Sequence, residues 1–138
     1  MFDQILCIDD DPIALMLCKK VITKAAFSNE IITAQNGEEA LLYFNTLKYN
    51  TKPNDLNSKK PRLIFLDLNM PVMGGWEFLD HFSTANYSDF NTINIIILSS
   101  TIDPDDLEKA KKYPMILHFL SKPITLQMLE YIKDKMGI

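Results

Sequence analysis

Cysteine, positive charge and long apolar runs are all scarce in this sequence of 138 residues. Its two cysteines, Cys7 and Cys18, are predicted to be small buried residues in a reducing compartment, not a disulfide or a metal-binding pair. No apolar run approaches the roughly 20 residues of a membrane span, and the N-terminus lacks the basic flank of a signal peptide. The net charge of −4 disfavours nucleic-acid binding through bulk electrostatics. We therefore expect a cytoplasmic protein that contacts neither membranes nor nucleic acids.

Apolar residues make up 47% of the sequence, which suits one domain spanning residues 1–138 with a core of its own. Five short apolar runs alternate with five helical patterns, and the runs cover residues 4–8, 30–34, 62–67, 93–98 and 117–120. Runs so uniformly apolar are typical of strands that are buried on both faces. The alternation predicts an α/β fold, namely a doubly wound, five-stranded parallel sheet with right-handed crossovers and helices on both faces.

Local signals add detail to this outline. Asp11 and Asp103 each precede a proline, which is typical of a helix N-cap followed by proline at the first helical position. The helix predicted over residues 12–26 carries Leu17 on its inward stripe. Residues 49–61 are polar, interrupted by prolines and without periodicity, so they are predicted to form a long surface loop that carries no chemistry.

Charged side chains follow three of the predicted strands. Asp9, Asp10 and Asp11 follow the first strand, Asp67 ends the third, and Lys122 follows the fifth. The carboxyl ends of parallel strands meet at one edge of the sheet, where open α/β sheets bind their ligands, so these side chains are expected to lie together. Two carboxylates 4 Å apart repel by about 4 kcal/mol at an effective dielectric constant near 20, and a nearby cation must offset that repulsion. Mg²⁺ accepts one or two carboxylates and binds phosphate oxygens, so it suits this site.

Four sequence blocks together resemble the receiver domains of two-component response regulators. The blocks are residues 8–12 (IDDDP), 66–75 (LDLNMPVMGG), 98–100 (LSS) and 119–123 (FLSKP), and they occur in the family's order at the predicted strand ends. The resemblance extends over essentially the whole chain. It implies a flavodoxin-like fold with strand order 2-1-3-4-5, as in stand-alone, CheY-like receivers. It also implies that a partner histidine kinase phosphorylates an aspartate of the chain.

The resemblance assigns roles to the acidic residues. Asp67 would be the phosphoacceptor, attacking a phosphohistidine to form an acyl phosphate. Asp10, Asp67 and the backbone carbonyl of Asn69 would hold Mg²⁺, with Asp9 positioning the ion. Phosphoryl transfer asks the protein mainly for in-line placement and charge neutralisation, and this set of oxygen ligands would serve both.

Five further residues receive roles in the same way. Lys122 would neutralise charge on the phosphoryl group, and Ser99 would donate a hydrogen bond to it and move when it arrives. Phe119, which stands where many relatives carry Tyr, would fill the space that Ser99 leaves and so complete a conformational switch. The Lys122–Pro123 bond is expected to be cis, because X-Pro bonds are those where this isomer costs little. Gly74, like Gly75, is expected to serve backbone geometry with a positive φ angle and to touch no ligand.

The resemblance also implies partners. The phosphoryl group would come from a histidine kinase or a histidine phosphotransfer protein. The chain ends just past its last helix, so a single receiver without an output domain is expected. Such a chain would signal by docking on another protein through the helix over residues 104–113, the strand over 117–120 and the final helix. It would otherwise pass its phosphoryl group onward or act as a phosphate sink. We expect a phosphoacceptor that takes part in its own phosphorylation and dephosphorylation, not an enzyme.

Three alternatives share parts of this inventory. A small Mg²⁺-dependent phosphatase resembling the haloacid dehalogenase family would place its nucleophile after the first strand in an Asp-x-Asp-Gly-Thr-like run, whereas residues 9–12 read DDDP. A receiver-like module that is not phosphorylated would not need Asp10, Asp67, Ser99 and Lys122 together. A flavin mononucleotide binder would want a hydroxyl-rich loop after the first strand, where the acidic triplet would repel phosphate.

Overall fold

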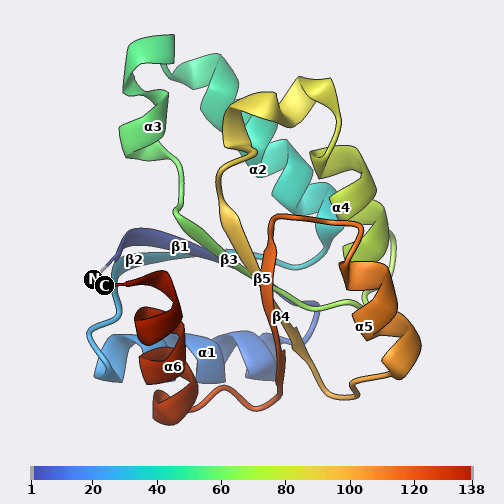
Figure 1. Cartoon of the computed structure of the whole chain (residues 1–138). Helices are drawn as coiled ribbons and strands as arrows, with labels where there is room; N and C mark the ends of the chain where they lie inside the picture. Colours follow the sequence, from blue (N-terminus) through green and yellow to red (C-terminus); the bar gives the residue numbers. More distant parts are fainter. Residues whose placement is uncertain (1, 138) are drawn as a thin grey trace.

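The predicted doubly wound parallel sheet is confirmed. The computed structural model describes residues 2–137, and Figure 1 shows their arrangement. Five parallel strands pair in the order β2-β1-β3-β4-β5. The strands are β1 Phe2–Ile8, β2 Ser28–Ala34, β3 Leu63–Leu66, β4 Asn94–Ser99 and β5 Ile116–Ser121. The helices are α1 Pro12–Lys24, α2 Gly37–Asn50, η1 Pro53–Asp55, α3 Leu56–Lys59, α4 Gly75–Phe82, η2 Ala85–Phe90, α5 Pro104–Ala110 and α6 Leu126–Met136.

Helices cover both faces of the sheet and make two hydrophobic layers. Helices α1 and α6 pack on one face, and α2 and α4 pack on the other (Figure 1). Neighbouring residues of β3 alternate between the layers, so that Ile64 joins the α2/α4 layer and Phe65 the α1/α6 layer. Burial on both faces explains why the central strands read as continuous apolar runs. Within residues 2–137, every helix is too short or too polar to cross a membrane.

Side-chain caps begin the helices that follow the functional edge of the sheet. The carboxylate of Asp11 accepts a hydrogen bond from the Ile13 N–H at 2.9 Å, and that of Asp103 accepts one from the Asp105 N–H at 2.9 Å. Both predicted caps are therefore confirmed. Because each cap fixes where its helix starts, the loops after β1 and β4 have defined lengths and directions.

Residues 49–61 do not form the irregular loop that their composition predicts. Helix α2 extends to Asn50, and η1 and α3 follow within the stretch. Leu56, the first residue of α3, is 7% exposed and belongs to the α2/α4 layer. A single apolar residue among polar ones produces no periodic signal, although burying it is enough to fasten the segment to the core.

In helix α1 the predicted inward stripe holds for Cys18 and Ile22 and fails for Leu17. Leu15, Cys18 and Ile22 are buried, whereas Leu17 is 42% exposed. The observed spacing of three and four residues is still helical, so the period was right and the phase was wrong for Leu17. The start of α1 consequently presents apolar side chains beside the carboxyl ends of the strands.

Candidate functional site

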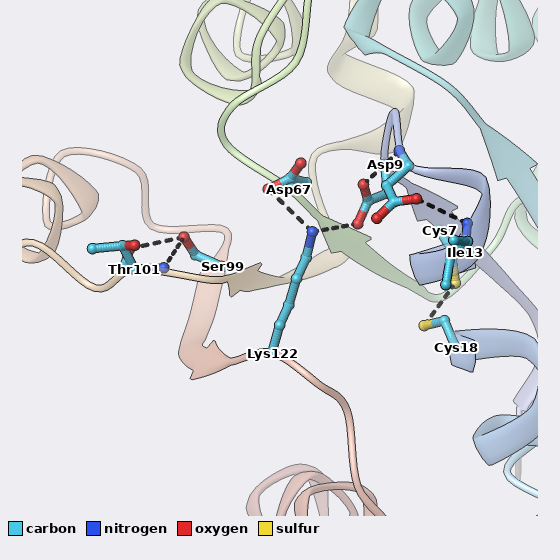
Figure 2. Close-up of polar contacts among 9 residues, drawn as sticks. Cys7, Asp9, Ile13, Cys18, Asp67, Ser99, Thr101 and Lys122 are labelled. Atoms are coloured by element: carbon cyan, nitrogen blue, oxygen red, sulfur yellow. Dashed lines mark hydrogen bonds and ion pairs between the residues drawn. The ribbon is translucent and has the colours of Figure 1, made fainter. Parts of the chain in front are cut away.

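The carboxyl ends of four strands bring the predicted site residues together (Figure 2). Backbone pairing continues one residue past the strands: the Asp67 N–H donates to the Ile8 carbonyl at 2.9 Å, and the Lys122 N–H donates to the Ser99 carbonyl at 2.8 Å. These bonds fix the backbone from which each functional side chain projects. The site is thus built on the rigid sheet: Ser99 ends β4, and Asp67 and Lys122 directly follow β3 and β5.

Three carboxylates crowd this edge. Asp9, Asp10 and Asp67 each offer an oxygen within 4.8 Å of the others. Asp9 is 6% exposed and Asp67 is 7% exposed, whereas Asp10 is open to solvent. The Asp9 carboxylate also accepts a hydrogen bond from the Asp11 N–H at 3.0 Å. The site therefore holds concentrated and partly buried negative charge.

Lys122 supplies positive charge to the cluster, and it lies closer to Asp9 than to Asp67. Its Nζ is 2.6 Å from Asp9 Oδ2 and 3.5 Å from Asp67 Oδ1 (Figure 2). Burial alone would lower the pKa of Lys122, but the hydrogen bond and charge of Asp9, together with Asp67, raise it above its usual value. The lysine is therefore firmly protonated, and it bridges the two buried carboxylates.

The environment of Asp67 disfavours its ionised form in spite of the nearby lysine. Burial and the charge of Asp9 raise the pKa of Asp67 from 3.8 to about 6, although Lys122 and a backbone hydrogen bond from Asn69 act in the opposite direction. The carboxylate of Asp67 is thus destabilised when it is ionised. A second cation at this edge would relieve that strain.

The donor set fits Mg²⁺ rather than a softer metal. All three clustered side chains offer carboxylate oxygens, which hard divalent cations prefer, and exposed Asp10 leaves room for the water ligands that Mg²⁺ keeps. The backbone of Asn69, whose carbonyl is a predicted ligand, lies close enough to the Asp67 carboxylate to lower its pKa. The residues present therefore suit the predicted ion.

The hydroxyl of Ser99 is occupied within its own loop. Ser99 is 1% exposed, and its Oγ donates to the Thr101 carbonyl at 2.8 Å and accepts from the Thr101 N–H at 3.3 Å (Figure 2). To bond a phosphoryl oxygen, the hydroxyl must give up this turn. A change in the hydrogen bonds of Ser99 would therefore alter the loop that leads from β4 to α5.

Gly74 does not have the positive φ angle that the sequence predicted. Its φ is −77° and its ψ is 178°, whereas Val72 in the same loop has a φ of 70°. Close approach explains the two glycines instead. A Cβ on Gly74 would lie 2.9 Å from the Leu68 carbonyl oxygen, and one on Gly75 would lie 2.6 Å from the Asp67 carbonyl oxygen. Helix α4 therefore begins in direct contact with the backbone of Asp67.

The remaining predictions concern the fifth strand. The Lys122–Pro123 bond is cis, as predicted. Phe119 is half-buried, pairs in register with Ile97 of β4 and packs against the α2/α4 layer. It therefore lies on the core side of the edge strand, on the same face of the sheet as α4.

Cys7 and Cys18 are buried and free, as predicted, but the sequence interpretation missed that they lie side by side. Cys7 Sγ and Cys18 Sγ are 3.6 Å apart (Figure 2), and both line a cavity of about 230 Å³. Asp9, Asp67 and Lys122 line the same cavity. The available signal was the strand period of two, which places Cys7 on the same face as Asp9. Nothing in the sequence fixes the position of Cys18 across from it.

Comparison with known proteins identifies the family. The family described as the response regulator receiver domain matches residues 5–132. The chain belongs to this family. Family membership implies phosphoryl acceptance on an aspartate, and it favours the receiver over the haloacid dehalogenase alternative.

Three known proteins illustrate the similarity, and each aligns with most of this chain. The two-component response regulator ARR17 of Arabidopsis thaliana is 29% identical over 130 residues, which cover 94% of this chain and 82% of the relative. A two-component response regulator from Cytophaga hutchinsonii has a crystal structure that matches at a TM-score of 0.84 with 29% identity, covering 99% of this chain and 98% of that one. The chemotaxis response regulator CheY4 of Vibrio cholerae shares the fold, with a TM-score of 0.72, 23% identity and coverage of 98% of both chains.

The raised pKa of Asp67 predicts that its amide variant is more stable. In the presence of a chelator at pH 7, Asp67→Asn should raise the free energy of unfolding by about 1–2 kcal/mol, since one pKa unit corresponds to 1.36 kcal/mol and partial solvent screening reduces the effect. The folded pKa is the higher one, so the wild type loses stability as pH rises through about 6. Below about pH 4 the carboxyl is protonated in both states, and the advantage of the variant should vanish.

Urea unfolding between pH 4 and 8 measures this difference. Asp134→Asn, on an exposed position of α6, is the control for loss of one negative charge. A destabilised Asp67→Asn at pH 7, or a difference that stays constant across the pH range, would contradict the assigned electrostatics.

Proposed function

We propose that Asp67 is the phosphoacceptor and that a histidine kinase or a histidine phosphotransfer protein supplies the phosphoryl group. Asp67 combines three properties that support this assignment. It directly follows the central strand β3, it lines the cavity at the carboxyl edge, and Lys122 Nζ lies 3.5 Å from its Oδ1. The observation that carries the proposal is the crowding of Asp9, Asp10 and Asp67 within 4.8 Å. Such a cluster can hold a divalent cation, and the cation would in turn bind the oxygens of a phosphoryl group on Asp67.

The chain's own residues account for most of the chemistry. A carboxylate oxygen of Asp67 attacks phosphorus, the bond from phosphorus to the donor's imidazole nitrogen breaks, and an acyl phosphate forms. With its pKa at about 6, Asp67 is ionised and nucleophilic at neutral pH. Lys122 exchanges part of its contact with Asp9 for the phosphoryl oxygens, which need charge compensation.

Mg²⁺ is the proposed cofactor. Asp10, Asp67 and the backbone carbonyl of Asn69 would hold it, and Asp9 would position it. When bound, the ion neutralises charge on the carboxylates and on the phosphoryl oxygens. Asp9 then serves both the ion and Lys122, which explains why a buried carboxylate pairs so closely with a lysine that faces the acceptor.

The loop of Ser99 would convert phosphorylation into a structural change. A hydrogen bond from Ser99 Oγ to a phosphoryl oxygen replaces its bond to the Thr101 carbonyl, and the chain then leads directly to α5 through the Asp103 cap. Half-buried Phe119 on the adjoining strand is the side chain that would follow this movement. Phosphorylation would shift a pre-existing equilibrium between two arrangements.

Helix α5 is suited to movement because it buries no residue in the core and is held by side-chain contacts at the surface. Every residue of α5, Pro104–Ala110, is exposed or half-buried. Trp76 of α4 donates from Nε1 to Asp106 Oδ1 at 3.3 Å, lies 4.9 Å from Lys109 Nζ, and stacks on Tyr113 at 5.6 Å between ring centroids. Trp76 follows Gly75, which touches the backbone of Asp67. We propose that α5, β5 and α6 form the surface that a downstream protein reads.

Intact-mass spectrometry after incubation with acetyl phosphate tests the acceptor. The wild type should gain one phosphoryl group in the presence of Mg²⁺ and none in the presence of a chelator, and Asp67→Asn should gain none under either condition. Asp11→Asn is the matched control, because it removes the same charge two residues from Asp9 and asparagine also caps helices. Labelling of Asp67→Asn at the wild-type rate would overturn the assignment. Steady release of free phosphate without an adduct would favour a phosphatase.

The fluorescence of Trp76 tests the switch, because it is the chain's one tryptophan. Phosphorylation should move its emission maximum to longer wavelength as the contacts with Lys109 and Tyr113 loosen and water reaches the indole. Asp67→Asn in the same Mg²⁺ and acetyl phosphate should show no such shift. A fully labelled wild type with unchanged emission would contradict coupling between the acceptor and α5.

A further inference from the structure

The two thiols form a pair that the phosphorylation chemistry does not use. Cys7 lies on β1 and Cys18 on α1, and their Sγ atoms are 3.6 Å apart. Both side chains are buried, at 2% and 4% exposure, and both are free. An aliphatic side chain at either position would also fill this part of the core. The two cysteines instead place two oxidisable sulfur atoms next to each other.

The cavity gives a small molecule a route to the thiols. Its lining runs from Cys7 and Cys18 to Asp9 and Lys122 of the phosphorylation site, and to Ile13 at the start of α1, which is 63% exposed. Figure 2 shows the pair beside Asp9. An uncharged oxidant of the size of a hydroperoxide fits within about 230 Å³.

Closure of the pair would act on the acidic loop. A disulfide requires the sulfur atoms to approach from 3.6 Å to about 2.05 Å. Strand β1 is paired on both sides, with β2 and β3, so α1 is the element that must move. The chain between the two cysteines contains Asp9, Asp10 and Asp11, so the bond would close a covalent ring around the loop that holds two carboxylates of the site.

We propose that Cys7 and Cys18 are a redox modification site, closed to an intramolecular disulfide by hydroperoxides, and that closure slows phosphoryl uptake by Asp67. One thiol gives up its proton as its sulfur attacks the peroxide oxygen; the O–O bond breaks, a sulfenic acid forms, and the proton leaves on the released water or alcohol. The sulfur of the second cysteine then attacks the sulfenic sulfur, forms the S–S bond and expels water. Two thiols lose two electrons and two protons in total, and one hydroperoxide is reduced. The part of this proposal that concerns uptake rests on the proposed phosphoacceptor function.

The environment of the pair keeps the reduced form as the resting state. The hydrogen bond with Cys18, burial and the nearby negative charge of Asp9 raise the pKa of Cys7 well above its usual value. Cys7 therefore stays protonated at neutral pH, and thiolates are the reactive species.

Mapping of the oxidised protein tests the modification. The full chain is treated with hydrogen peroxide, unfolded, alkylated with iodoacetamide and analysed by intact mass and peptide mapping. The expected product is a monomer that has lost two hydrogen atoms, resists alkylation and yields a peptide linking Cys7 to Cys18. Cys7→Ala and Cys18→Ala should each leave the remaining cysteine unable to form this link. Full alkylation of both cysteines after peroxide treatment, or disulfides formed only between chains, would overturn the proposal.

Acetyl phosphate labelling of the same samples tests the consequence. The oxidised wild type should label several-fold more slowly than the reduced protein and recover with dithiothreitol, whereas peroxide should leave the labelling rate of Cys18→Ala unchanged. Equal rates for the mapped disulfide form and the reduced form would refute the regulatory effect. If the reduced protein does not label at all, the phosphoacceptor proposal fails, and the disulfide mapping still decides whether the pair is a modification site.

Discussion

Repulsion among carboxylates is the constraint on which the rest of the site depends. Asp9 and Asp67 are buried, Asp10 adds a third charge within 4.8 Å, and Lys122 offsets part of the total. Burial and the charge of Asp9 together raise the pKa of Asp67 to about 6. The parallel sheet imposes this crowding, because adjacent strands end at the same edge. The fold therefore gathers more negative charge at this edge than Lys122 offsets, and a bound cation would compensate the excess.

The features that were predicted from sequence are those set by local rules. Uniform apolar runs gave the buried strands, and Asp11 and Asp103 ahead of proline gave the caps. The errors came from features that depend on three-dimensional packing. Leu56 packs in the core with residues of α2, which its polar neighbours in the sequence do not indicate. At position 74 a side chain would clash with the Leu68 carbonyl oxygen, so glycine is needed there for close packing and not for its φ angle. The sequence placed the acidic residues and the lysine at one edge, but it could not reveal that Lys122 lies closer to Asp9 than to Asp67.

The two faces of the sheet carry different consequences of the same site. On one face, Gly75 joins the backbone of Asp67 to α4, and Trp76 joins α4 to the weakly held α5. On the other face, the cavity joins Asp67 and Lys122 to the thiols beneath α1. Phosphorylation would be read through the first connection, and oxidation would act on the site through the second.

The measurement that bears most directly on this account is the free energy of unfolding as a function of Mg²⁺ concentration, for the wild type, Asp10→Asn and Asp11→Asn. If the crowded carboxylates form a cation site, the stability of the wild type and of Asp11→Asn should rise with Mg²⁺, by about 1.4 kcal/mol per tenfold increase above the dissociation constant. Asp10→Asn should be more stable than the wild type without Mg²⁺, because a like charge is gone, and should gain little when the ion is added. A wild type whose stability does not respond to Mg²⁺, or an equal gain in Asp10→Asn, would contradict the account.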